Sequence, residues 1–159
     1  MTLYQIIKGL EEISKRHPNI RTAADGSIYT IMNANPSVKY GTFIVTQNQH
    51  RQTEMFDIYG LTLFYVDRLV DNREDNRLQI QSIGKQVLGN IIQTFCEDYD
   101  VDFPLVVRYT PFTEKFLDSC AGMYCQVEFE IIKDNVLMIK EIINEVLDSE
   151  DERNDNENF

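Results

Sequence analysis

Residue types that commonly carry catalysis or metal binding are scarce in this sequence. Its 159 residues include no tryptophan, two histidines, three cysteines and four prolines. An odd number of cysteines without regular spacing does not make a disulfide framework and is typical of reduced thiols in a cytosolic setting. No stretch approaches the roughly 18 apolar residues of a membrane-spanning helix, so we expect no membrane insertion.

Sequence motifs for catalysis are absent as well. There is no glycine-rich phosphate loop, no serine-nucleophile elbow and no paired-histidine zinc motif. His17 lies beside a proline at a helix end and His50 lies in a polar segment, so we expect both to be solvated or capping residues. Cys120 and Cys125 have a spacing seen in some metal sites, but Cys96 would add only a third ligand and no histidine completes the set. We therefore predict no active site, no metal site and no cofactor.

The net charge of −11 is distributed unevenly along the chain. Residues 145–159 contain seven acidic residues and one arginine, which gives −6, whereas residues 1–144 contain 19 acidic and 14 basic residues, which gives −5. A negative surface repels phosphate backbones and anionic lipids. We therefore expect neither sequence-independent nucleic-acid binding nor docking on a membrane.

Hydrophobic periodicity in the first half predicts one helix and two strands. Apolar residues recur every three to four positions in residues 3–15, which predicts an amphipathic helix that ends before Pro18. Residues 19–36 are expected to be a loop with one short strand at 28–31. Strands are predicted at 38–46 and 53–66, because both segments are rich in β-branched and aromatic residues.

The second half repeats this pattern. A helical period from residue 77 to residue 97 predicts a long helix, in which Gly84 and Gly89 indicate close packing on a sheet. Strands are predicted at 105–112 and 122–132. In the last strand Cys125, Val127, Phe129 and Ile131 are expected to point inward, and Tyr124, Gln126, Glu128 and Glu130 outward.

These elements predict an α+β domain. In the order α-β-β-α-β-β-α, two β-hairpins form a four-stranded antiparallel sheet with helices packed on one face. We divide the chain into this domain (residues 1–133), a C-terminal amphipathic helix (134–148) and an acidic tail (149–159) that is expected to be disordered.

Two segments carry more apolar surface than one domain is expected to bury. The strand 53–66 is apolar on both faces after Gly60, which predicts either a bulge at Gly60 or coverage of one end on both sides, for example by a neighbouring subunit. The helix 134–148 has its own apolar stripe, which either packs on its domain or docks on a partner. The candidate contact residues are Phe56, Ile58, Tyr59, Leu61 and Tyr65 in the strand, and Val136, Ile139, Ile143 and Val146 in the helix.

The segment YGTFIVTQNQHRQTEMFDIYGLTLFYVDRL (residues 40–69) resembles small virion proteins from phages and prophages of gut Bacteroidetes, as does the helix IQSIGKQVLGNII (80–92). The order of elements in residues 1–133 resembles that of the tail-completion and tail-terminator proteins of tailed bacteriophages. This resemblance implies a structural virion protein without an active site, made and assembled in the host cytoplasm. Copies would join into a ring at the head–tail neck or tail and contact other neck and tail proteins.

The resemblance also implies particular contacts. The segment 47–52 would form the tip of a long hairpin that reaches an adjacent ring or subunit through Gln47, His50, Arg51 and Gln52. DNA would only pass through the lumen of the ring without being bound specifically.

Two other functions stay open at the level of sequence. One is a non-viral adaptor whose acidic tail or last helix binds a basic partner. The other is a thiol-dependent enzyme that uses Cys96, Cys120 or Cys125, which requires a thiol of low pKa.

Overall fold

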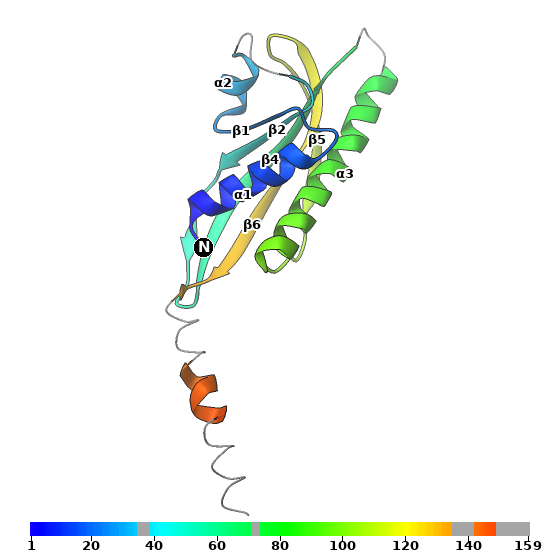
Figure 1. The fold of residues 1–159 in the computed structure, drawn as a ribbon. Coiled ribbons are helices and arrows are strands. Elements are labelled where there is room, and N and C mark those ends of the chain that lie inside the picture. Colours follow the sequence, from blue (N-terminus) through cyan, green and yellow to red (C-terminus); the bar gives the residue numbers. More distant parts are fainter. Residues whose placement is uncertain (35–38, 71–73, 135–141, 149–159) are drawn as a thin grey trace, which may run out of the picture.

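Six strands form one mixed sheet in the order β1-β2-β4-β6-β5, with the short β3 paired to β4 (Figure 1). The computed structural model describes residues 1–34, 39–70, 74–134 and 142–148. The elements are α1 (Leu3–Arg16), β1 (Thr22–Asp25), α2 (Ile28–Met32), β2 (Thr42–Gln47), β3 (Arg51–Gln52), β4 (Phe56–Arg68), α3 (Glu74–Tyr99), β5 (Arg108–Lys115) and β6 (Ser119–Ile132). Residues 142–148 are also helical.

The α+β class is confirmed, but the four-stranded antiparallel sheet and the expected order of elements are wrong. β2, β4, β6 and β5 pair antiparallel as expected, whereas β1 adds a parallel edge strand beside β2. β1 lies where a loop was expected, and its sequence Thr-Ala-Ala-Asp has little strand propensity. It is held by tertiary contacts, since the backbone amides of Arg21 and Thr22 both donate to the Gly41 carbonyl oxygen (2.9 and 3.3 Å).

The short strand expected at residues 28–31 is instead the helix α2. Ile28, Ile31 and Met32 follow helical spacing, and all three belong to a cluster on the face of the sheet opposite α1 and α3. The same cluster contains Ile44 of β2 and Val66 of β4. The second face of β4 is therefore covered by the chain itself at this end, and no neighbouring subunit is needed there.

Two helices cover the first face of the sheet. α1 and α3 contact each other and the sheet, and the main core lies between them and the strands (Figure 1). The amphipathic helix expected at residues 3–15 is confirmed, with Thr2 accepting a hydrogen bond from the amide of Gln5 as its N-cap.

The predicted alternation of β6 is confirmed. Cys125, Val127, Phe129 and Ile131 are buried in the core under α1 and α3. On the second face Gln126, Glu128 and Glu130 are exposed and Tyr124 is half-buried.

Residues 48–50 form a bulge between β2 and β3. These three residues lie opposite only two residues of β4, Tyr59 and Gly60. Gly60 leaves room for them, because a Cβ atom at this position would lie 2.5 Å from the Gln49 carbonyl oxygen. The irregularity predicted at Gly60 is therefore present, but the extra residue is in the opposing strand.

The hairpin turns later than the resemblance implies. Residues 47–52 are not its tip, since Arg51 and Gln52 form β3 and pair with β4. The chain reverses at residues 53–55, where the amide of Thr53 donates to the Phe56 carbonyl oxygen (2.8 Å). A polar run is compatible with an exposed edge strand as well as with a turn. The polar composition of residues 47–52 was therefore not sufficient to predict the position of the hairpin tip.

Gly84 and Gly89 of α3 do not pack equally closely. A Cβ atom on Gly84 would lie 2.9 Å from Tyr65 Cδ1 and 3.0 Å from Met123 Cβ, so α3 meets the sheet at this residue. A Cβ atom on Gly89 would meet only the Tyr109 hydroxyl, at 3.3 Å. The close packing predicted from both glycines is tightest at Gly84.

This difference gives a matched pair of substitutions. We expect Gly84→Ala to lower the free energy of unfolding by about 1–2 kcal/mol, because overpacking of ~1–3 kcal/mol outweighs the ~1 kcal/mol that alanine gains in helix propensity. Gly89→Ala should be neutral or stabilising, since only a side-chain hydroxyl must move. Urea unfolding of both variants measures the difference, and equal effects would contradict the close approach at Gly84.

Candidate functional site

The second face of the sheet is open beyond the cluster that α2 covers. Phe64, Phe112 and Tyr124 pack on one another at the border, with ring centroids 5.6–6.1 Å apart. Beyond them, the sheet and the connection between α3 and β5 enclose a groove of about 1040 Å³. It is lined by Asn48, Gln49, Gly60, residues 102–106, Arg108, Thr110, Tyr124, residues 126–128 and Glu130.

One wall of this groove is apolar and uncovered. Phe103, Leu105 and Val106 have exposed fractions of 45%, 101% and 67%. The segment that carries them is anchored at both ends, because Val101 and Val107 pack against the main core. The exposed side chains are therefore held on a fixed connection beside the sheet.

The floor and the other wall are polar. Gln126, Glu128 and Glu130 extend from β6, and Arg108 lies opposite Gln126 in the register of β5 and β6. Arg51 Nη2 donates to Glu128 Oε2 at 2.8 Å, which ties β3 to β6 near the groove. Among the described residues no ion pair includes Arg108.

The predicted contact residues of segment 47–52 are exposed. Gln47, His50, Arg51 and Gln52 lie along the outer side of the hairpin instead of at its tip. The His50 ring packs edge-to-face on Tyr59, with centroids 5.6 Å apart, and its Nε2 lies 3.2 Å from Gln47 Oε1. Their role in subunit contacts stays a prediction.

The contact residues predicted in β4 divide by burial. Phe56 and Tyr59 are half-buried, whereas Ile58, Leu61 and Tyr65 are buried. Leu61 and Tyr65 face α1 and α3 in the main core, so they stabilise the domain and offer no surface in this structure. The expectation that this strand leaves them uncovered is wrong, because the two helices cover one face and α2 part of the other.

The last helix is described only in part. Val136 and Ile139 lie outside the described residues. Ile143 and Val146 each have an exposed fraction of 51%, and all seven residues from 142 to 148 are exposed. Whether this helix packs on its own domain or docks on a partner stays a prediction.

The apolar wall of the groove was not predicted from the sequence. The run VDFPLVV (residues 101–107) was divided between a helix end and the start of a strand at Leu105. The strand begins only at Arg108. Pro104 within the run was a signal for an irregular connection, because proline donates no hydrogen bond to a sheet.

The three thiols are buried and free. Burial raises the pKa of Cys96 and Cys120 to about 11 and that of Cys125 to about 12. Nearby, the Tyr40 hydroxyl donates to Asp118 Oδ2 at 2.7 Å, and burial together with this carboxylate raises the pKa of Tyr40. A nucleophilic thiol requires a lowered pKa, so these environments weigh against the thiol-enzyme alternative.

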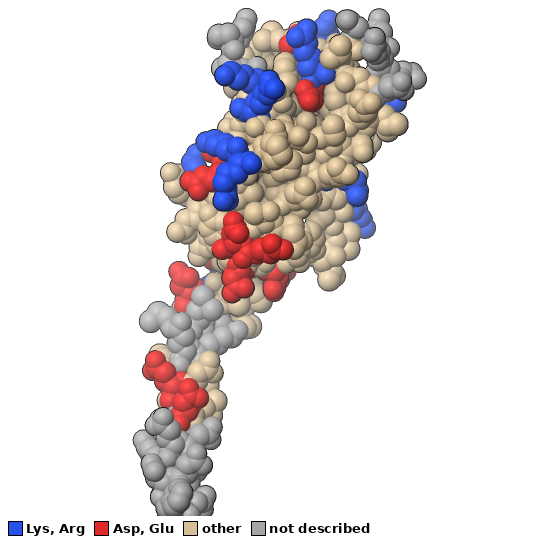
Figure 2. Space-filling model, turned by 45° about the vertical axis from the view of Figure 1, so that its right-hand side comes forward, with Lys and Arg blue, Asp and Glu red and all other residues tan. Residues whose placement is uncertain are grey.

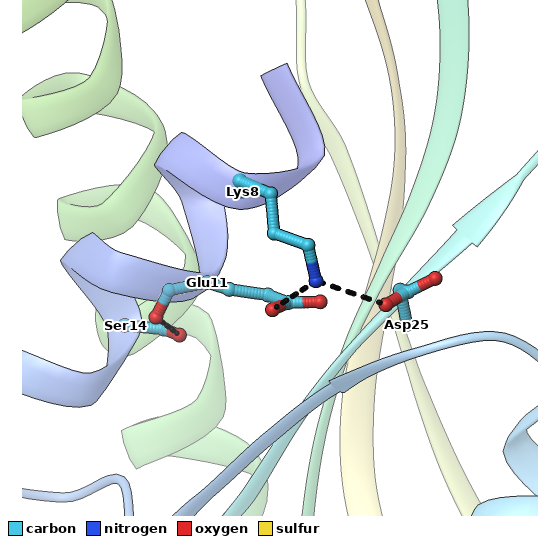
Figure 3. A network of polar contacts seen from close by, with 4 residues as sticks. All are labelled: Lys8, Glu11, Ser14 and Asp25. Carbon is cyan, nitrogen blue, oxygen red and sulfur yellow. Dashed lines mark hydrogen bonds and ion pairs between the residues drawn. The ribbon is translucent and has the colours of Figure 1, made fainter. Parts of the chain in front are cut away.

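A buried carboxyl group, that of Glu11, lies in the contact between α1 and β1 (Figure 3). Lys8 Nζ lies 3.2 Å from Glu11 Oε2 and 3.8 Å from Asp25 Oδ1, and Ser14 Oγ donates to the Glu11 carbonyl oxygen at 2.7 Å. Glu11 Oε1 is buried without a hydrogen-bond partner. Burial and the neighbouring Asp25 carboxyl raise the pKa of Glu11, while Lys8 opposes the shift. Neither the groove on the second face nor the smaller hollow beside His17 includes these four residues, so we interpret the network as a structural tie.

The described residues contain neither a metal-binding cluster nor a helix able to cross a membrane. Within residues 1–34, 39–70, 74–134 and 142–148, no group of three or more His, Cys, Asp or Glu side chains could hold a metal ion. In the same residues no helix has the length and apolar character needed to cross a bilayer.

No protein-family model matches this sequence, and no curated protein matches it. The groove and the exposed helical residues are therefore interpreted from their own geometry and chemistry.

The Glu11 network gives a pH-dependent prediction. In the wild type Glu11 Oε1 is buried without a hydrogen-bond partner, which costs ~1–3 kcal/mol. In Glu11→Gln the side-chain amide can accept a hydrogen bond from Lys8 and donate one to Asp25, so this cost is removed. We expect the variant to be about 1 kcal/mol more stable than the wild type near pH 8. Because the folded-state pKa of Glu11 is raised, its favourable contribution is complete below its ordinary value of 4.5 and is lost as pH rises through the raised value.

The advantage of Glu11→Gln should therefore shrink as pH falls toward 4.5. Urea unfolding at several pH values measures it, with Glu12→Gln, at an exposed position on the same helix, as the control. A variant that is less stable than the wild type near pH 8 would contradict the unsatisfied carboxylate.

The buried thiols give a second prediction. We expect iodoacetamide to alkylate all three cysteines of the native protein on the order of 10²-fold more slowly than in the urea-unfolded chain, since few thiolates form at neutral pH. Peptide mass spectrometry after timed labelling measures each rate. One rapidly labelled cysteine would revive the thiol-enzyme alternative.

Proposed function

We propose that this protein is a structural subunit that joins copies of itself side by side into a ring at the head–tail neck or tail of a tailed phage. The observation that carries the proposal is the apolar wall of the groove. A leucine that is fully exposed, flanked by two further exposed apolar side chains, generally marks an interaction surface. The phage assignment itself rests on the resemblance of residues 40–69 and 80–92.

The position of this surface supports assembly through unlike contacts. The groove lies on the second face of the sheet, whereas the exposed residues 142–148 follow the end of β6 (Figure 1). When two different surfaces of one chain meet, the contact is heterologous, and it generates a closed ring if the rotation between copies closes. A ring subunit needs two such surfaces and no active site.

The charge distribution fits a protein that DNA passes without binding. Figure 2 shows acidic side chains gathered toward the end of the domain from which residues 142–148 extend, and basic ones toward the opposite end. Acidic surface facing a lumen repels the phosphate backbone, so DNA slides through.

The same acidic end is the observation that favours the second candidate, a non-viral adaptor for a basic partner. The two functions differ in what the acidic tail does. An adaptor that uses its tail loses binding when residues 149–159 are deleted, whereas deletion of these residues alone should leave a ring nearly unchanged.

Native mass spectrometry and negative-stain microscopy test the proposal at micromolar concentration. We expect closed oligomers of a single copy number, formed equally well by the full chain and by the chain without residues 149–159. Many such subunits close only on an adjacent ring, so the protein should also be co-expressed with the products of the genes on either side of its own. A strict monomer that binds none of these products would overturn the proposal.

A further inference from the structure

The middle of α3 carries no acidic residue, although the chain as a whole is strongly acidic. Residues 76–96 contain two basic residues, Arg77 and Lys85, and neither aspartate nor glutamate, which gives this stretch a charge of +2. The acidic residues of α3 lie before and after it, at Glu74, Asp75, Glu97 and Asp98. The long helix is therefore locally basic in a chain with a net charge of −11.

The exposed side of α3 is formed by a row of uncharged polar side chains with apolar and basic neighbours. The row recurs every three or four positions, and all its members are exposed: Gln79, Ser82, Gln86, Asn90 and Gln93. Leu78, which is 64% exposed, borders the row on one side and Ile83 borders it on the other. Lys85 follows Leu78 by seven residues, on the same side of the helix, and its Nζ lies 5.5 Å from the centroid of the Tyr109 ring.

The groove on the second face has the complementary chemistry. Three carboxylates line it, those of Asp102, Glu128 and Glu130, against a single cation, Arg108. Its apolar wall is uncovered. Carboxylates attract cations and accept hydrogen bonds from amides, so the groove suits an occupant that is basic, rich in amides and partly apolar. The exposed side of α3 has all three properties.

The exposed side of α3 and the groove of the same chain cannot meet. α3 packs on the first face of the sheet, where a Cβ atom on Gly84 would lie 2.9 Å from Tyr65 Cδ1, whereas the groove lies on the second face (Figure 1). The sheet therefore separates the two surfaces within one chain. A contact between them has to join two copies.

We propose that the exposed side of α3 of one copy docks in the groove of a second copy, with Leu78 on the apolar wall and Lys85 paired with Glu130. This inference deepens the proposed function and rests on it, because it names the contact through which neighbouring subunits join. Each chain supplies one helix and one groove, so the contact is heterologous and can repeat from copy to copy.

The charges of the groove determine how α3 lies in it. Arg77 directly precedes Leu78, and Asp102 directly precedes the apolar wall, so these two charges meet when Leu78 contacts the wall. Glu128 is already paired with Arg51, which leaves Glu130 for Lys85. The uncharged row of α3 then lies at Arg108, which would repel either cation. Exchange of the charges of Lys85 and Glu130 is therefore a specific test of this orientation.

Disulfide trapping between two differently labelled chains detects the contact directly. Leu78→Cys and Leu105→Cys are made in separate full-length chains, mixed and oxidised. The three native cysteines stay silent because burial raises their pKa values to about 11 or 12. The control mixes Leu105→Cys with Tyr4→Cys, whose position on α1 is 71% exposed. All three substitutions are at exposed positions, so circular dichroism should show an unchanged fold.

We expect the mixture of Leu78→Cys and Leu105→Cys to form disulfide-linked heterodimers at least about tenfold faster than the control mixture, because docking raises the effective concentration of the two thiols. A chain that carries both substitutions should form disulfide-linked multimers. A rate no higher than that of the control would overturn the inference, and so would a disulfide formed only within single chains.

The charge exchange supplies a second readout between the same two chains. Lys85→Glu, added to the chain with Leu78→Cys, should slow trapping about fivefold, because an attractive surface pair becomes a repulsive one. Glu130→Lys, added to the chain with Leu105→Cys, should restore the rate. The two changes are in different chains, so the rescue reports a contact between copies. An unchanged rate with Lys85→Glu would overturn the proposed orientation.

The trapping result and the proposed function can fail separately. If trapping fails while the wild type still forms rings in the microscope, the subunits join through other surfaces, so this inference is wrong and the proposed function stands. If trapping and ring formation both fail, with no binding to the neighbouring gene products, the proposed function fails too.

Discussion

The pairing of β4 with β6 is the interaction on which the rest of the structure depends. The two strands pair along the whole of β4, from Phe56↔Ile132 to Arg68↔Cys120. They are central in the sheet, so β2 and β5 can pair only on their outer sides. α3 packs across both strands at Gly84, where a side chain would collide with Tyr65 and Met123. The alternation of the two strands then decides which side chains face the helices and which face the open second side.

The length of this pair also explains why the second face is unevenly covered. α2 has only five residues, and with Ile44, Val66, Phe116 and Cys120 it covers one end. The aromatic cluster of Phe64, Phe112 and Tyr124 marks the border. Beyond this border β4 and β6 continue, but on the second face no helix of the described residues lies over them. The groove is therefore open because β4 and β6 are long and α2, which covers their second face at one end, is short.

The local sequence pattern was sufficient to predict an element and its buried face where side-chain periodicity matches the burial in the structure. β6 alternates strictly between apolar and polar residues, and α1 has a helical stripe with a capping residue, so both were predicted with the correct faces. Prediction was wrong where tertiary contacts outweigh propensity. β1 is a strand because its backbone pairs with β2, and β3 is a strand because β4 offers it a partner, although both segments are polar or small. Leu61 and Tyr65 were expected on a surface because β4 is apolar on both faces, and the sequence did not show that α1 and α3 cover one face and α2 part of the other.

The candidate site was predicted only in part for a related reason. Ile143 and Val146 were found by helical periodicity and are exposed. The apolar wall at Phe103, Leu105 and Val106 has no period, since it lies on an irregular connection that depends on Val101 and Val107 for its position. Chain assembly through this wall is the central claim, and cryo-electron microscopy of the assembled protein tests it most directly. The account predicts that a neighbouring subunit covers Phe103, Leu105 and Val106, which are exposed in the single chain; rings in which every groove is empty and faces solvent would contradict it.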